Sequence, residues 1–306
     1  MTAAVRTVLG DLPAAELGLS NAHDHLFLRS PLLPGQELDD VPAARAELRA
    51  FAALGGRAVF QWTPYGMGRR AGELPALSRA TGVHLVAATG LHQAAHYSSQ
   101  VLAEVRDGLA ELFVRELTEG IGGTGPRAGM IKVAGGFHGL DAHARHTLRA
   151  AAEAHHRTGA TIGVHLELGT GALDVLDLLC DAAGVPPERV VLGHLNRSPD
   201  LTVHRLLAEA GAYLAFDGPS RANHATDWQL PAALAALADA GYADRLLLGG
   251  DTTTAGARAA TGGGPGMPYL LRRLRPRLAL ALGEPLVDRI LRENPARAFA
   301  VDWAAR

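Results

Sequence analysis

The stretch Leu19-Ser-Asn-Ala-His23-Asp-His25 contains two histidines separated by one residue, after a short apolar lead-in. Side chains at positions i and i+2 of an extended strand point the same way, so His23 and His25 are expected to project together, with Asp24 on the other side. Two adjacent imidazoles pack poorly in a core but form a good half of a metal site. Because His-x-His tripeptides also occur on surfaces, this stretch alone leaves a metal site and a surface pair as equal alternatives.

The composition limits the class of protein. The chain has 306 residues, 48% of them hydrophobic, which suits one barrel domain spanning residues 1–306. The 29 basic and 31 acidic residues give a net charge of −2, which argues against a nucleic-acid or membrane-surface protein. No apolar run is long enough for a membrane span, residues 1–10 show no apolar leader, and Cys180 is the single cysteine. A cytoplasmic location is therefore expected.

Short apolar segments alternate with segments of helical periodicity along the whole chain. After the opening strand, we expect strands at 58–60, 83–88, 130–133, 161–166, 190–194, 212–216 and 245–251. Helices are expected at 41–54, 73–81, 99–119 (with Ser99 as a cap), 141–158, 172–183, 201–210, 228–240, 269–282 and 284–299, the last broken at Pro295.

This alternation predicts an α/β fold, a closed (β/α)8 TIM barrel with its site at the C-terminal ends of the strands. The alternative is an open doubly wound sheet, which usually carries a phosphate-binding glycine loop after its first strand. Here the first strand ends in His-Asp-His instead. The glycines at 262–266 follow a strand that Asp251 has already ended, so a loop is expected there.

Further polar residues occur at the C-terminal ends of the expected apolar strands. They are Lys132, His165, His194 and Asp251, spaced one or two βα units apart. A charged or imidazole group at the end of a buried strand costs free energy unless it is paired, hydrogen-bonded or metal-bound. These four residues, together with His23 and His25, are expected to converge on one barrel mouth.

Four imidazoles, one carboxylate and one lysine suit a pair of divalent ions. This donor set favours zinc, with manganese, cobalt or iron as alternatives. An ammonium group on Lys132 would repel metal ions. The lysine would therefore have to be neutral, or carboxylated by carbon dioxide and so able to bridge both ions.

The ordered motifs resemble the phosphotriesterase family of the amidohydrolase superfamily over essentially the whole chain. The matching segments are Asn21-Ala-His23-Asp-His25, Val86-Ala-Ala-Thr-Gly90, Ala128-Gly-Met-Ile-Lys132-Val133, Val164-His165, Leu192-Gly-His194, Leu248-Gly-Gly-Asp251 and Glu293-Asn-Pro-Ala-Arg-Ala-Phe299. The resemblance implies a homodimer and two metal sites that are bridged by a carboxylated lysine. It gives the more buried ion to His23, His25 and Asp251, the other to His165 and His194, and the bridge to Lys132.

This resemblance implies a hydrolase acting on a small-molecule ester, lactone or phosphotriester. Two cations sharing one water lower its pKa, and the resulting hydroxide attacks the substrate while Asp251 accepts the proton. Two alternatives stay open. One is amide hydrolysis or a lyase reaction on the same site, and the other is a non-catalytic metal-containing protein that binds a ligand.

Substrate contacts are expected in the loops above the strands. Candidates are His96, Tyr97, Arg221 and Arg258, of which the arginines could recognise an anionic substrate. Lactonase members of the resembled family carry an aromatic pair after the third strand and an arginine after the seventh. Here a single tyrosine stands in the first of these places and Gly218 in the second.

Two carboxylates are candidates for orienting the metal-binding histidines, namely Asp24 and Asp217. The remaining histidines of the helices and of their entry loops are expected at the surface: His138, His143, His146, His155, His156 and His204.

Overall fold

The computed structural model describes residues 3–123, 125–218 and 225–303. Among these residues, eight parallel strands form one sheet in the order β10-β9-β8-β7-β6-β5-β4-β3. Backbone N–H groups of Gly250 and Asp251 donate to the His23 carbonyl at 2.8 and 3.0 Å, which joins the two edge strands. The expected (β/α)8 barrel is confirmed. Its strands are β3 Ser20–Asp24, β4 Ala58–Gln61, β5 His84–Gly90, β6 Met130–Ala134, β7 Ile162–His165, β8 Val190–Leu192, β9 Tyr213–Asp217 and β10 Leu246–Gly249.

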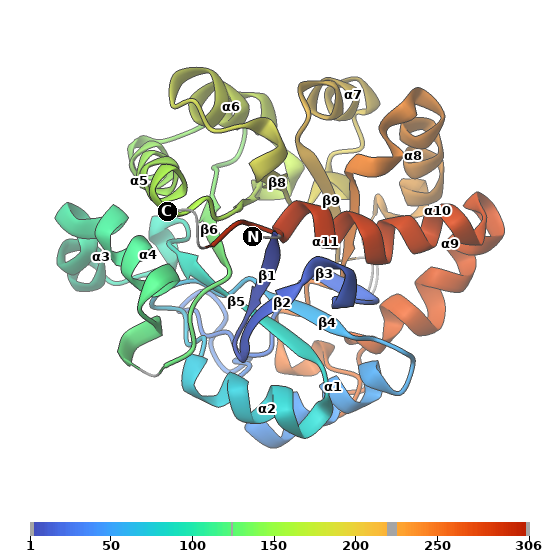
Figure 1. Cartoon of the computed structure of the whole chain (residues 1–306), viewed down its shortest axis with the longest axis horizontal. Helices are drawn as coiled ribbons and strands as arrows, with labels where there is room; N and C mark the ends of the chain where they lie inside the picture. The colour runs from blue at the N-terminus through green and yellow to red at the C-terminus, as the bar shows by residue number, and fades with distance from the viewer. Residues whose placement is uncertain (1–2, 124, 219–224, 304–306) are drawn as a thin grey trace.

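Helices surround the sheet on its outer side (Figure 1). They are α1 Val41–Ala52, α2 Leu74–Thr81, α3 Ser99–Val105, α4 Leu109–Thr118, α5 Ala142–Thr158, α6 Ala172–Leu176, α7 Leu201–Ala210, α8 Leu230–Leu237, α9 Arg275–Leu282, α10 Glu284–Asp288 and α11 Asn294–Phe299. No helix among the described residues is both long and apolar enough to cross a bilayer.

Two hydrophobic layers stabilise the barrel. The inner layer is formed by side chains inside the sheet, including Phe60, Trp62 and Met130, which are fully buried. The outer layer lies between the sheet and the helices and is rich in leucine and valine. Burying one such large apolar side chain stabilises a fold by about 1.5–3 kcal/mol, so both layers hold the strand ends in fixed positions.

An N-terminal hairpin, which the sequence did not indicate, closes one end of the barrel. It comprises β1 Ala4–Thr7 and β2 Gly10–Pro13. Ala4 pairs with Val301, and the hairpin lies next to α11 in front of the barrel strands in Figure 1. Phe299 of α11 stacks on Phe60 with ring centres 4.1 Å apart. This end is filled with side chains, which leaves the C-terminal ends of the strands for a site.

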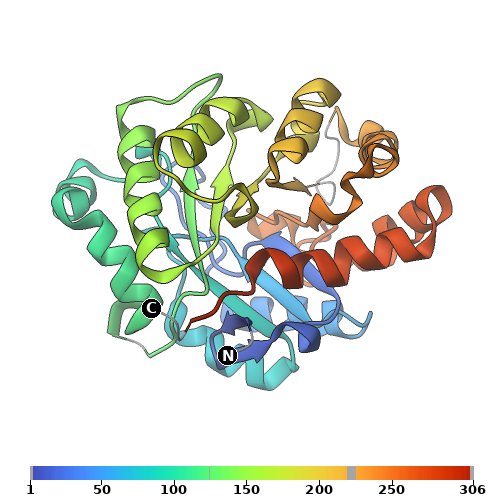
Figure 2. The same cartoon turned by 45° about the horizontal axis from the view of Figure 1, so that its top comes forward.

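Two helix predictions were wrong in detail. The helix expected at 99–119 is two helices, α3 and α4, separated by a 3-10 turn at Arg106–Gly108, and Ser98 rather than Ser99 caps the first. The helix expected to break at Pro295 runs on through a π turn at Arg289–Glu293 into α11 (Figure 2). Pro295 lies in the first turn of α11, where a missing N–H is tolerated.

Two histidines expected at the surface are buried. His155 on α5 and His204 on α7 have exposed fractions of 3% and 1%. Each lies on the side of its helix that faces the barrel, and Nδ1 of His155 is 2.8 Å from the carbonyl oxygen of Ala160. The surface prediction was wrong for these two because an amphipathic helix can carry an imidazole on its inner face.

Candidate metal centre

All six predicted ligands lie around one cavity at the C-terminal end of the barrel. The cavity has a volume of about 450 Å³, and its wall includes His23, His25, Lys132, His165, His194 and Asp251. These residues come from strands β3, β6, β7, β8 and β10 or from the positions that directly follow them. The parallel strands therefore bring together residues that are up to 228 positions apart in the sequence (251 − 23).

The first half of the site is His23, His25 and Asp251. One carboxylate oxygen, Oδ1 of Asp251, lies 3.4 Å from Nε2 of His25 and 3.7 Å from Nε2 of His23. Nδ1 of His25 is 2.7 Å from the Thr63 hydroxyl, which itself donates to the carbonyl of Phe27. The hydroxyl therefore accepts the proton of Nδ1, and the lone pair of Nε2 stays available. These three side chains form one group that could hold a metal ion.

Asp217 orients two of the histidines. Its carboxylate is fully buried, lies 2.7 Å from Nδ1 of His23, and also hydrogen-bonds Nδ1 and the backbone N–H of His194. Burial favours the protonated acid, but His194 and His23 outweigh it and hold the pKa of Asp217 below its usual range. Asp217 also forms a compact group with these two histidines, and the hydrogen bonds to Nδ1 explain this group without a metal ion. The carboxylate holds both rings through Nδ1, so Nε2 is the remaining nitrogen of each ring.

His165 and His194 face each other across the second half of the site. Nδ1 of His165 and Nε2 of His194 lie 2.8 Å apart, within hydrogen-bond distance of each other. Burial lowers the pKa of both rings, which keeps them neutral and able to act as ligands. Nε2 of His165 is 3.1 Å from a carboxylate oxygen of Glu167.

Lys132 is buried between these two halves. Burial lowers the pKa of its amine to about 7, although Asp251 opposes that shift. Strand β5 packs closely against it, since a Cβ atom on Gly90 would lie 1.8 Å from the carbonyl oxygen of Lys132. A partly neutral amine suits a metal centre better than an ammonium ion. The donor set of imidazoles, carboxylate and amine therefore fits divalent ions.

Two predicted ligands have unusual backbone conformations. His194 and Asp251 have φ values of 64° and 47°, in the left-handed region that disfavours residues with a Cβ atom. Such strain costs of order 1–3 kcal/mol per residue and concentrates at functional sites. Asp24 supports the backbone next to Asp251, because its carboxylate accepts from the backbone N–H group of Thr252 at 2.8 Å. The same carboxylate accepts from the backbone N–H group of His25, also at 2.8 Å. Asp24 thus contacts the backbone of His25 rather than an imidazole.

The predicted substrate residues are dispersed. His96 lines the cavity. Tyr97 does not, and its hydroxyl accepts from the backbone N–H of His92 at 2.8 Å. Arg258 is 2% exposed and donates to backbone carbonyls outside the cavity, among them that of Asp40 at 3.3 Å. Arg221 lies outside the described residues.

The sequence reasoning missed several cavity residues, among them Arg197, Gln93 and Glu167. Arg197 donates from Nη2 to Oδ2 of Asp251 at 2.6 Å, and its side chain is 12% exposed. Gln93 donates to Glu167 at 3.0 Å, and both residues line the cavity. Arg197 stands three residues after His194, so its position directly after an expected strand was a usable signal. Nothing in the sequence distinguishes Gln93 or Glu167 from other loop residues.

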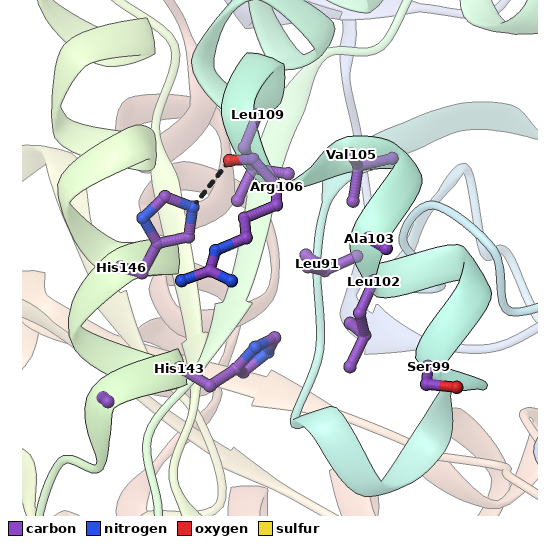
Figure 3. Close-up of a pocket in the computed structure, with 10 residues that line it drawn as sticks. Leu91, Ser99, Leu102, Ala103, Val105, Arg106, Leu109, His143 and His146 are labelled. Carbon is purple, nitrogen blue, oxygen red and sulfur yellow. Dashed lines mark hydrogen bonds between the residues drawn. The ribbon is translucent and has the colours of Figure 1, made fainter.

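A second cavity, of about 470 Å³, lies on the outer side of the loop after β5. Figure 3 shows Arg106, His143 and His146 facing Leu102 across it. Nε2 of His143 is 2.7 Å from the carbonyl oxygen of His92. Among the described residues, the two groups that could hold a metal ion lie elsewhere. The assignment of the metal centre therefore rests on chemistry and not on cavity size.

Comparisons with known proteins agree with this geometry. The model of the phosphotriesterase family matches residues 3–299. A phosphotriesterase homology protein of Escherichia coli is 33% identical over 92% of this chain and 98% of its own length. A phospho-furanose lactonase of Mycoplasmopsis synoviae is 29% identical over 97% of this chain and 92% of its own length. The crystal structure of a Listeria monocytogenes lactonase superposes with a TM-score of 0.91 at 29% identity, covering 97% and 98% of the two chains.

Proposed function

The chain belongs to the phosphotriesterase family, and on that premise we propose that it is a metal-dependent hydrolase of esters, lactones or phosphotriesters. The observation that carries this proposal is the convergence of the imidazoles of His23, His25, His165 and His194 with Lys132 and Asp251. The names of the lactonase relatives support lactones among these three substrate classes. The cavity volume of about 450 Å³ suits a small molecule.

The donor atoms divide into two sets. His23, His25 and Asp251 would hold one ion, and His165 and His194 the other, with a carboxylated Lys132 between them. Two divalent ions, for which zinc is the best match to these donors, would supply an activated water and polarise the oxygen that gains charge.

The protein's own groups orient these donors and move the proton. Asp217 and Thr63 bind the Nδ1 atoms of the histidines and so keep each Nε2 atom directed into the site. Asp251 presents two oxygens with different neighbours, of which Oδ1 faces the histidines. The other oxygen, Oδ2, accepts from Nη2 of Arg197 at 2.6 Å and would also take the proton of the attacking water.

The test combines metal analysis with a panel of substrates. We expect two divalent ions per chain by elemental analysis and measurable hydrolysis of at least one of a set of aryl esters, lactones and phosphotriesters. Removal of the metal with a chelator should abolish turnover, and added zinc should restore it. Two ions per chain without hydrolysis of any panel member would contradict the proposal and favour a lyase, an amide hydrolase or a ligand-binding protein.

A further inference from the structure

Arg197 places a guanidinium group inside the metal cavity. The residue ends the short 3-10 turn Leu195–Arg197, which directly follows His194. Its side chain is 12% exposed and forms part of the cavity wall. The same turn is held by Asn196, whose side chain donates to Asp227 at 2.9 Å and accepts from the backbone N–H of Asp217 at 3.1 Å. Arg197 is therefore carried by an ordered turn rather than by a free loop.

The guanidinium group and the His23–His25 pair approach different oxygens of Asp251. Nη2 of Arg197 donates to Oδ2 at 2.6 Å, whereas Oδ1 lies 3.4 Å from Nε2 of His25. The ion pair therefore leaves Oδ1 available as a ligand. It also fixes the orientation of the guanidinium plane, so less conformational entropy is lost when that plane binds a second partner.

Gly218 provides the space that the guanidinium group occupies. A Cβ atom at this position would lie 2.9 Å from Nη2 of Arg197 and 3.6 Å from Oδ2 of Asp251. Gly218 also has a φ of 84°, which residues with a side chain rarely adopt. The end of β9 thus contributes no side chain here, and the neighbouring turn after β8 supplies a cation in its place.

The guanidinium group has donors that Asp251 does not use. An arginine side chain carries five N–H groups in a fixed plane, and its bond to Asp251 uses one of them. Nε of Arg197 is buried and has no hydrogen-bond partner among the described residues. Among the described residues, the other carboxylate that lines the cavity is that of Glu167, and it hydrogen-bonds with Gln93 and His165. Glu167 is therefore not the missing partner of Arg197.

We propose that Arg197 determines substrate specificity by binding an anionic oxygen group of the substrate, a carboxylate or a phosphate, next to the bond that is hydrolysed. The proposal rests on the proposed function, because it assigns the substrate class of the same cavity. Planar guanidinium donors match both kinds of oxygen group, and the shared chemistry is a pair of negatively charged oxygens.

Matched substrates measure this recognition directly. One pair comprises the acetate and the hemisuccinate esters of one phenol, and a second pair comprises a lactone with and without a phosphate group. In Arg197→Gln we expect the ratio of kcat/KM for the charged over the neutral member to fall about 10- to 100-fold, mainly through KM. The ratio cancels any effect that the loss of the Asp251 contact has on both members. A larger change in the ester pair would indicate a carboxylate, and a larger change in the lactone pair would indicate a phosphate.

Binding gives a readout that does not need turnover. Calorimetric titration of the metal-free and metal-loaded proteins with succinate and with inorganic phosphate should show binding of at least one anion that weakens about tenfold or more in Arg197→Gln. Arg197→Lys should recover part of this loss, because it restores the charge but not the planar donors. Arg205→Gln removes an exposed cation from α7 and is the matched control, with no expected change.

Gly218→Ala tests the geometry while Arg197 is retained. The added methyl group would displace the guanidinium group, so the charged-to-neutral ratio should fall in this variant as well. Unchanged ratios and unchanged anion binding in Arg197→Gln would overturn the proposal. A wild-type protein that binds two ions but hydrolyses no ester, lactone or phosphotriester, charged or neutral, would instead count against the proposed function, and the calorimetric experiment would still decide the role of Arg197.

Discussion

At the scale of single residues, one buried carboxylate, that of Asp217, holds two histidines of the candidate site in fixed orientations. The sequence predicted the candidate ligand histidines from their positions at the ends of apolar strands, and it singled out Asp217 because that residue ends a strand. Nothing in the sequence predicted that Asp217 would contact both His23 and His194. This contact depends on the closure of the barrel, which brings β9 beside β8 and within reach of β3. Residue types predict ligands, whereas their hydrogen-bond partners require the fold.

We predict that Asp217→Asn weakens metal binding. The amide can hydrogen-bond to only one imidazole as an acceptor and has no charge to hold the other, so one of His23 and His194 loses its fixed orientation. The affinity for zinc should fall about 10- to 100-fold. Competition with a chromophoric chelator measures this value, and Asp239→Asn, which alters an exposed carboxylate outside the cavity wall, is the control. Equal zinc affinities of Asp217→Asn and the wild type would contradict the prediction.

We predict that Asp251→Asn keeps its metal ions but loses turnover. The amide oxygen can still face His23 and His25, but it accepts a proton far more weakly than a carboxylate. The kcat value should fall by about 10²- to 10⁴-fold, the usual contribution of general acid–base catalysis. Elemental analysis of the variant separates this effect from loss of metal. Near-normal turnover with two ions bound would exclude the proposed role of Asp251.

At the scale of secondary structure, strands and helices were predictable where their pattern is local. The helix expected at 201–210 is α7 with the same bounds, and the strands of the barrel agree with their expected bounds within a few residues. The hairpin of β1 and β2 was missed; its two strands pair with each other, and backbone bonds to Leu85 and Val301 anchor it to the barrel. The loops above the barrel were least predictable. Arg197 reaches Asp251 across Gly218, and neither residue signals this contact in the sequence.

We predict that Gly90→Ala destabilises the end of β5 severely. An added Cβ atom would lie 1.8 Å from the backbone carbonyl of Lys132, so the two strands must separate. We expect a loss of more than about 3 kcal/mol in the free energy of unfolding, measured by urea denaturation. Gly82→Ala is the matched control, because Gly82 also has a positive φ of 70° but has open space around its Cβ position. That variant should lose only about 1 kcal/mol. Similar losses in both would show that backbone conformation, and not contact, decides the cost.

At the scale of the whole molecule, the same closure that forms the barrel also completes the site. Backbone bonds from Gly250 and Asp251 to His23 join the last strand to the first, and they set Asp251 opposite the His23–His25 pair. The order of the ligands along the chain was enough to predict this arrangement, because parallel strands place all their C-terminal ends together. A single domain, a homodimer and a cytoplasmic location stay predictions, since each depends on properties outside the geometry of one barrel.

The buried imidazoles predict how stability depends on pH. Burial lowers the pKa of His204, whereas an unfolded histidine titrates near its ordinary value of about 6.5. Below that pH the unfolded chain binds more protons than the folded one, so the free energy of unfolding falls as the pH drops from about 7 to 5. Burial raises the pKa of Asp24 to about 7, so this residue makes the free energy of unfolding rise as the pH drops over the same range. The contribution of His204 must therefore be measured by comparing variants. His204→Leu should show a shallower decline in urea denaturation than the wild type. The exposed control His146→Leu should leave the decline unchanged, and equal slopes in both variants would contradict the assignment to His204.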